Sequence, residues 1–133
     1  MDFICPCGSK KPYEACCKKY HLGKATAPTA KDLLRSRYSA YALNAFEYII
    51  KTTHPKSHLY ADDLEQWADS ITFFSENTNF EKLEILDFQD GKSEATATFI
   101  AHLSQNGKDC SFQEKSHFIK QDGLWTYYSA ELG

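Results

Sequence analysis

The chain has 133 residues, of which 42% are hydrophobic and 25% are charged, the composition of one ordinary globular domain with room for a small appendage. This length excludes two full-sized domains, and no stretch approaches the roughly 20 apolar residues that a membrane span requires. The first residues lack the cationic and apolar regions of a signal peptide, so the cytoplasm is the expected location.

The net charge of −3 is unevenly distributed along the chain. Residues 1–24 contain five lysines and carry a charge of +3, whereas the rest of the chain carries −6. A small basic head therefore precedes an acidic body. The acidic total argues against a general nucleic-acid binder.

Four of the five cysteines lie in the head, at Cys5, Cys7, Cys16 and Cys17. Neither a Cys-x-Cys pair nor a vicinal pair closes into an unstrained disulfide, and clustered cysteines in a cytosolic chain indicate a metal. Zinc prefers four sulfur or imidazole ligands at the corners of a tetrahedron. We therefore predict one structural Zn²⁺ on these four cysteines, with His21 as the alternative to Cys17 as fourth ligand.

The head is too small to bury enough apolar surface to fold alone. A bound metal would supply its folding free energy, on the order of 10–16 kcal/mol at neutral pH. Pro12 suits the first turn of a short helix that presents the second cysteine pair, and nearby lysines would offset the charge of a four-thiolate zinc site. Free thiols or a redox couple are the alternative interpretation.

Residues 25–30 contain no charge and no large side chain, which predicts a linker. The expected organisation is a zinc-binding head at 1–24, this linker, and a body at 31–133.

Three helices are expected at the start of the body. Thr29 and Asp32 match a capping box, so the first helix is expected from about Ala30 to Leu43. Asn44 should end it before a short helix that starts at Phe46.

The third helix is expected to be capped by Asp62 or Asp63, and the hydrophobic period then changes to that of strands. Three dipeptides, Asp90-Gly91, Asn106-Gly107 and Asp122-Gly123, are typical of tight hairpin turns. They predict a four-stranded antiparallel meander, although a tight first turn would place a glutamate on the apolar face, so a longer loop or a bulge is expected there.

If Asn106-Gly107 and Asp122-Gly123 are tight turns, they predict the pairing of the last three strands. The predicted pairs are Phe99 opposite Glu114, Ala101 opposite Phe112, and Phe118 opposite Tyr127. One face of the sheet is then apolar and must be covered, so the helices are expected to fill the concavity of a curved sheet. The predicted fold class is α+β.

Two stretches of the chain resemble known families. The run Cys5-Pro-Cys-Gly-Ser-Lys-Lys-Pro-Tyr-Glu-Ala-Cys-Cys17 resembles the SEC-C motif, a zinc knuckle also found at the C-terminus of the SecA translocation ATPase, where it engages the chaperone SecB. Leu34-Arg-Ser-Arg-Tyr-Ser-Ala-Tyr-Ala42, the His54-Pro55 step and Phe112-Gln-Glu-Lys-Ser-His-Phe118 resemble the bacterial YchJ-like family. That resemblance implies a nuclear transport factor 2-like, or cystatin-like, cone behind the zinc knuckle, and it implies no reaction.

Cones of this kind often hold a pocket between the sheet and the helices. Strand alternation puts the Glu114 carboxylate on the inward face, where it needs a partner, and Arg37, Tyr41 and His54 are the candidates. In one interpretation Glu114 is a general base and Tyr41 or His54 polarises a substrate oxygen. In the other, Arg37 and Glu114 form a buried ion pair that fixes the first helix on the sheet. Arg35 is interpreted as a solvated charge.

The outer face of the sheet carries apolar residues among polar ones, which predicts a homodimer through that face; they are Ile100, Ile119, Leu124 and Tyr128. His102 and His117 on the same face are expected to be exposed, with a second metal site as the alternative. Cys110 is expected to be a small core residue.

Three functions follow, and whether the protein is an enzyme stays open. The first is a protein-interaction module whose zinc knuckle docks a protein or ribosome-associated partner. The second is a small-molecule pocket or active site around Glu114, Arg37, Tyr41 and His54. The third is a weak nucleic-acid contact by the head, whose charge of +3 falls to about +1 once four thiolates hold a zinc ion.

Overall fold

Helix α2 (Ala30–Leu43) begins and ends at the predicted capping residues. The Thr29 hydroxyl accepts the Asp32 N–H at 3.1 Å and donates to the Asp32 carboxylate at 3.0 Å. Asn44 ends the helix in the left-handed conformation, with φ of 57°. Ala30, the last residue of the predicted linker, is the first residue of α2 and is fully buried.

Two more helices complete the body. Helix α3 (Phe46–Lys51) is the predicted short helix, and it ends at Thr52, before Pro55. Helix α4 (Leu64–Glu76) begins at Asp63, whose carboxylate accepts the Gln66 N–H at 3.0 Å.

The strands form the predicted antiparallel meander, in the order β1-β2-β4-β5 with the two-residue strand β3 paired to β2. Their bounds are β1 (Asn79–Gln89), β2 (Glu94–Gln105), β3 (Lys108–Asp109), β4 (Phe112–Gln121) and β5 (Leu124–Leu132). The three predicted residue pairs, Phe99 with Glu114, Ala101 with Phe112 and Phe118 with Tyr127, are all present.

The turns explain this register. Asn106-Gly107 and Asp122-Gly123 have positive φ at both positions, as two-residue hairpin turns of this kind require. The first turn is longer, because residues 90–93 separate β1 from β2, and β1 is also irregular between Phe80 and Lys82 and between Ile85 and Asp87. Glu84 consequently pairs with Ile100 and stays off the apolar face.

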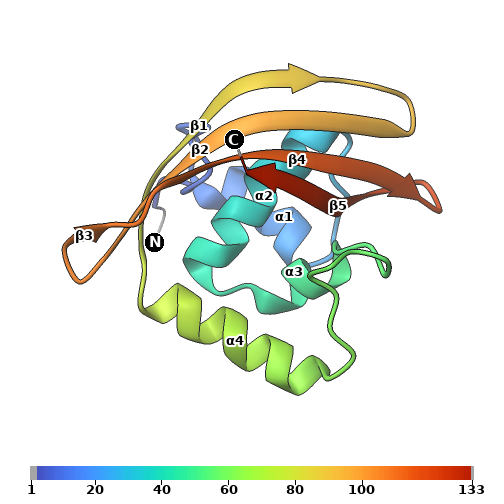
Figure 1. Ribbon diagram of the computed structural model, residues 1–133. Helices are drawn as coiled ribbons and strands as arrows, with labels where there is room; N and C mark the ends of the chain where they lie inside the picture. The colour runs from blue at the N-terminus through green and yellow to red at the C-terminus, as the bar shows by residue number, and fades with distance from the viewer. Residues whose placement is uncertain (1–2, 133) are drawn as a thin grey trace.

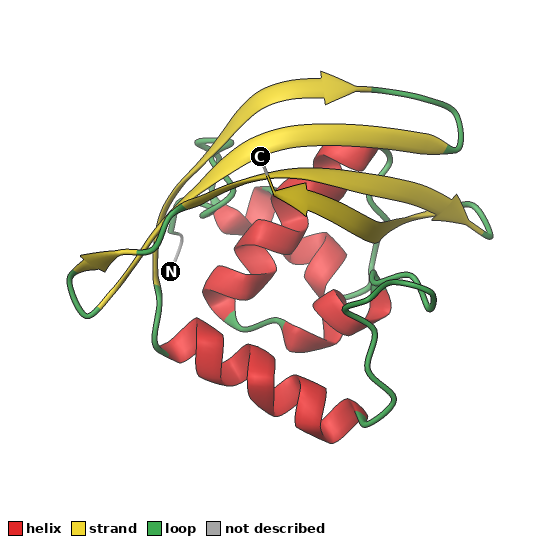
Figure 2. Cartoon of the chain, viewed as in Figure 1, coloured by secondary structure: helices red, strands yellow, loops and turns green. Residues whose placement is uncertain are grey.

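The computed structural model describes residues 3–132, and Figure 1 shows how their elements are layered. The sheet curves over α2, and α4 lies across the open side of the concavity, farther from the sheet. The same view coloured by secondary structure shows the helices gathered on the concave face of the sheet (Figure 2). The inward side chains of β2, β4 and β5 form the core with α2, as the strand pattern predicts.

The head packs against the body and does not extend away from it. Its first part is a small hairpin, closed by a bridge between Ile4 and Pro12, and two short helices follow, η1 (Tyr13–Ala15) and α1 (Lys18–His21). The single short helix expected here is interrupted because Cys16 has a non-helical backbone, with φ of −130° and ψ of −105°. Within residues 3–132, the helices are too short or too polar to cross a bilayer.

Candidate functional site

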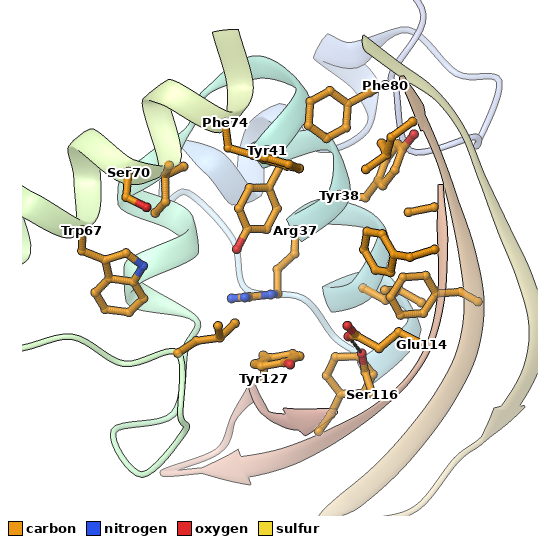
Figure 3. A pocket seen from close by; sticks show the side chains of 18 residues that line it. Arg37, Tyr38, Tyr41, Trp67, Ser70, Phe74, Phe80, Glu114, Ser116 and Tyr127 are labelled. Carbon is orange, nitrogen blue, oxygen red and sulfur yellow. Dashed lines mark hydrogen bonds between the residues drawn. The ribbon is translucent and has the colours of Figure 1, made fainter. Parts of the chain in front are cut away.

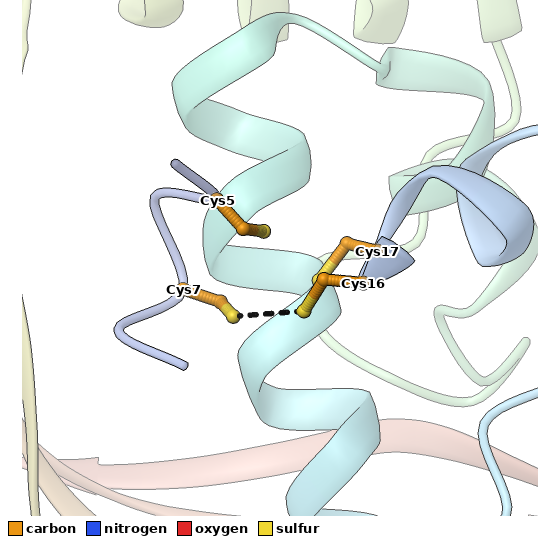
Figure 4. Close-up of side chains that lie close together, drawn as sticks. All are labelled: Cys5, Cys7, Cys16 and Cys17. Carbon is orange, nitrogen blue, oxygen red and sulfur yellow. Dashed lines mark hydrogen bonds between the residues drawn. The ribbon is translucent and has the colours of Figure 1, made fainter. Parts of the chain in front are cut away.

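The structure brings the four cysteine sulfurs of the head together (Figure 4). The hairpin supplies Cys5 and Cys7, and the segment that joins η1 to α1 supplies Cys16 and Cys17. All four sulfurs lie within 4.8 Å of one another, and none forms a disulfide. The distances are 3.6 Å from Cys7 to Cys16 and 3.9 Å from Cys16 to Cys17.

These distances fit a tetrahedral metal site. Four sulfurs at about 2.3 Å from a zinc ion are separated from one another by about 3.8 Å. Cys5, Cys7 and Cys17 are almost completely buried and Cys16 is half-buried, so a bound ion would be enclosed by protein. Enclosed four-cysteine sites are structural, because no coordination position is open to a substrate.

Crowding of the sulfurs changes their ionisation. The pKa of Cys7 lies well below its usual range because the Cys17 and Cys5 thiols donate hydrogen bonds to its thiolate. The pKa of Cys17 is raised because its thiol is a donor to Cys5 and Cys7 and because it is buried. The cluster therefore forms a thiolate readily, and thiolate is the form that binds a metal.

His21, the alternative fourth ligand, points to the body of the protein. Its Nδ1 is 2.7 Å from the Tyr13 hydroxyl, and its Nε2 is 2.8 Å from the Ser36 carbonyl oxygen. Burial lowers the pKa of His21 from its ordinary value, so the ring is neutral at pH 7 and its Nε2–H donates to Ser36. The geometry thus brings Cys17, and not His21, to the cluster.

Arg35 is not the solvated charge that its sequence position predicts, because it is half-buried and contacts the head. Its Nη1 donates to the Cys7 carbonyl oxygen at 3.0 Å, so a side chain from α2 holds the loop behind the first two cysteines. Gly8, next in that loop, has φ of +88°, a conformation that favours glycine. Ser9 contributes a hydroxyl 3.1 Å from the Cys16 sulfur.

A second candidate site is the cavity of the cone (Figure 3). It has a volume of about 420 Å³ and lies between the concave face of the sheet and helices α2 and α4. Most of its wall is aromatic or aliphatic, with rings from Tyr41, Trp67, Phe74, Phe99 and Phe112. Arg37 and Glu114 are the charged side chains in this lining.

Arg37 is held by oxygens of the α3 segment. Its Nη1 donates to the Ile49 carbonyl at 3.1 Å and to the hydroxyls of Thr52 and Thr53 at 2.8 and 3.2 Å. Its guanidinium carbon lies 4.9 Å from the centre of the Tyr127 ring, on which the group stacks. Arg37 is only 5% exposed.

The predicted buried ion pair between Arg37 and Glu114 is absent among residues 3–132. The Glu114 carboxylate instead accepts the Ser116 hydroxyl at 2.6 Å. The two charges stay apart because three acceptors in and just after α3 hold the guanidinium over Tyr127, whereas Glu114 projects from β4. Both charges influence Tyr127, whose pKa is raised by burial and then by the Glu114 carboxylate.

Of the other predicted pocket residues, Tyr41 lines the cavity and His54 does not. The His54 ring accepts the Lys56 N–H at 3.0 Å and packs edge-on against Tyr128. His54 follows α3 and its backbone N–H donates to the Tyr127 carbonyl oxygen, so it lies alongside β5, with its ring against Tyr128 and outside the cavity lining. The acid–base network predicted for the pocket is therefore not assembled around His54.

The outer face of the sheet carries both predicted histidines. His102 lies 3.0 Å from Glu84, and His117 lies 3.0 Å from Glu131, so each histidine has one carboxylate partner. The cysteine cluster is the metal-binding arrangement found within residues 3–132, and neither histidine belongs to it. Cys110 is half-buried against the core, as predicted.

Sequence reasoning missed the residues that connect the sites to the fold. Arg35 reaches the head across the chain, and no local pattern marks that contact. Thr52 and Thr53 accept hydrogen bonds from Arg37. The one sequence signal for this role is that the two hydroxyl residues are adjacent and directly follow a short helix.

A family model described as YchJ, middle NTF2-like domain, matches residues 29–130, which are the helices and sheet of the cone. The chain belongs to the YchJ-like family. A UPF0225 protein of Vibrio vulnificus (strain CMCP6) is 38% identical over 129 residues, which cover 96% of this chain and 74% of that protein. A UPF0225 protein of Streptomyces coelicolor is 37% identical over 132 residues, covering 96% of this chain and 94% of that protein.

Solved structures of SEC-C motif containing proteins match this YchJ-like chain from end to end. One from Rhodopseudomonas palustris has a TM-score of 0.81 and 32% identity, and covers 100% of this chain and 99% of its own. One from Psychrobacter arcticus has a TM-score of 0.79 and 26% identity, and the match covers 98% of this chain and 82% of that chain. A protein with a cystatin-like fold from Caulobacter vibrioides shares the fold alone, with a TM-score of 0.58 and 11% identity over 78% of this chain and 84% of its own. The α+β cone predicted from the sequence is thereby confirmed, and the cysteine cluster with its SEC-C relatives indicates metal binding.

Proposed function

We propose that this YchJ-like protein binds a small organic molecule inside its cone, while a structural Zn²⁺ on the four cysteines fixes the head against α2. The cavity supports this proposal most directly. Its volume of about 420 Å³ falls within the 300–1,000 Å³ typical of ligand pockets, and it combines apolar walls with a few polar groups. Binding is favoured over catalysis because His54, one of the proposed polarising groups, lies outside the cavity.

Zinc is the metal that the donor set favours. Four thiolates at tetrahedral spacing suit a soft or borderline cation, and the enclosed position suits a structural ion. When bound, the ion would link the hairpin to α1, and it would carry out no reaction. Elemental analysis of the reduced protein should find one equivalent of zinc, and Cys16→Ser should lose most of it. Much less than one equivalent in the wild type would contradict the zinc assignment.

Ligand binding can be tested by blocking the cavity. Ser70 lies on α4 at the cavity wall, is exposed and makes no side-chain hydrogen bond within the described part of the chain, so Ser70→Trp should fill the entrance and leave the fold intact. Gln66→Trp, on the same helix and outside the lining, is the matched control. Isothermal titration with 1-naphthol as a neutral aromatic probe should show binding to wild type and Gln66→Trp, and at least tenfold weaker binding to Ser70→Trp. Equal binding to all three proteins would contradict the proposal, and so would a wild type that binds neither 1-naphthol nor its carboxylate analogue 1-naphthoate.

Docking of a protein partner by the head is the second candidate function. Phe3, Ile4 and Leu22 are 48%, 61% and 57% exposed, and they lie on the segment that carries the five lysines of the head. Apolar side chains beside cations suit a partner with an acidic surface. A partner retained by the wild type should be lost on Ile4→Ser and kept on Ser70→Trp. The opposite pattern would contradict docking by the head.

A further inference from the structure

We propose that the ligand of the cone is a monocarboxylate with an apolar, ring-sized body, and that Arg37 binds the carboxylate. This inference rests on the proposed function, because it names the class of molecule that the cavity takes. It is argued from the charge, the hydrogen bonds and the surroundings of Arg37.

Arg37 is a buried cation that forms no ion pair within residues 3–132. A guanidinium stays protonated in proteins, and a buried charge is costly unless it is paired. The ion pairs within residues 3–132 are Lys18 with Glu14, His102 with Glu84 and His117 with Glu131, so Arg37 has no carboxylate partner there. Three neutral oxygens and the Tyr127 ring solvate the group without neutralising it.

The unused donors of Arg37 face the cavity. All three of its hydrogen bonds leave from Nη1, so Nε and Nη2 have no acceptor among the residues that the structure describes. Within residues 3–132, the Tyr38 hydroxyl is the one side-chain polar atom that is both fully enclosed and without a hydrogen-bond partner. Nε and Nη2 of Arg37 also have no partner there, so they cannot be fully enclosed. Because Arg37 lines the cavity, these two nitrogens are open to it. Figure 3 shows the guanidinium lying across the cavity floor above Tyr127, with the Tyr41 hydroxyl pointing toward it. Two adjacent N–H donors in one plane match the two oxygens of a carboxylate.

The rest of the cavity limits the ligand to one negative charge. Glu114 is the anionic side chain of the lining, and it opposes a second acidic group on the ligand. The remaining wall is mostly aromatic and aliphatic, which favours an apolar body and disfavours a phosphate or a sugar. A hydroxyl or amino group on the ligand would have Glu114 as its acceptor.

The test compares two probes with the same ring system, 1-naphthoate and 1-naphthol, at pH 7.5. The wild type should bind 1-naphthoate at least tenfold more tightly than 1-naphthol. Equal or tighter binding of 1-naphthol would overturn the carboxylate assignment and leave the proposed function standing. Binding of neither probe would overturn both.

Two variants test whether Arg37 binds the carboxylate of the ligand. Arg37→Gln should lose the preference for 1-naphthoate and retain 1-naphthol, with circular dichroism as the check on folding. Glu114→Gln keeps the shape of the side chain and removes the charge that opposes an anionic ligand, so 1-naphthoate affinity should rise several-fold. Within the described residues, Glu114 is half-buried and its one side-chain hydrogen bond is with Ser116, so Glu114→Gln should fold and tests the assignment even where Arg37→Gln does not fold. An unchanged or lower 1-naphthoate affinity in Glu114→Gln, or an unchanged preference in folded Arg37→Gln, would overturn the assignment.

Discussion

Arg35 and Arg37 are two residues apart on α2 and have different surroundings. Arg35 turns toward the head and donates to the Cys7 carbonyl, whereas Arg37 turns toward the cavity and is held by Thr52 and Thr53. Residues two apart on a helix do not share a face, so one helix directs two cations to two sites. A pattern of charges along the sequence shows that the faces differ, but not what covers each face.

The pH dependence of stability depends in part on His21. Its folded-state pKa is lowered by burial, so as the pH falls below about 6.5 the unfolded chain takes up a proton before the folded protein does. The stability that neutral His21 contributes is therefore complete above that pH and is lost as the pH falls through the folded value. Urea unfolding at pH 7.5, 6.5 and 5.5 with saturating zinc should show a steeper loss for wild type than for His21→Gln. Parallel curves would contradict a neutral, buried His21.

At the scale of elements, α2 connects the two candidate sites. Its Ser36 carbonyl accepts from His21, its Arg35 holds the cysteine loop, and its Arg37 and Tyr41 line the cavity. The helix can do this because both of its sides are covered, by the head on one and by the sheet and α4 on the other. Its position therefore determines the geometry of both sites.

The start of α2 should matter for stability. Thr29→Ala removes the hydroxyl that accepts the Asp32 N–H, and the loss of such a cap costs about 1 kcal/mol in the free energy of unfolding. Thr26→Ala, in the preceding coil, removes an exposed hydroxyl without a hydrogen bond in the described structure and should change stability by less than about 0.5 kcal/mol. Chemical denaturation of the two variants measures the difference. Equal effects would show that the cap contributes little.

At the scale of the whole molecule, the head and the cone have different sources of stability. The cone has a continuous apolar core between sheet and helices, whereas the head has a small cluster of cysteines with Tyr13 packed against it. The head is further joined to the cone by the contacts of His21 and Arg35 with α2. The cone therefore has a core of its own, whereas the head would depend on a bound metal and on its contacts with α2.

Removal of the metal should destabilise the head and leave the cone folded. With a zinc chelator, amide hydrogen exchange in residues 5–21 should become fast while the central strands β2 and β4 stay protected, because the sheet core contains no cysteine ligand. Mass spectrometry of peptides after exchange locates the change. Loss of protection in the sheet, or no change in the head, would contradict this division.

The sequence by itself determined much of this protein, because its signals are local. Thr29, Asn44 and the Asn-Gly and Asp-Gly turns act within a few residues, so they predicted helix ends, strand pairs and an α+β body, and the resemblance to the YchJ-like family implied the cone. The cysteine spacing likewise predicted a cluster of four sulfurs. Only the tertiary structure decided that Arg37 and Glu114 stay apart, that His54 lies outside the cavity and that Arg35 contacts the head. The positions of these side chains depend on hydrogen-bond acceptors that lie far away along the chain. Only the packing of α3 and of the head against α2 brings those acceptors within reach.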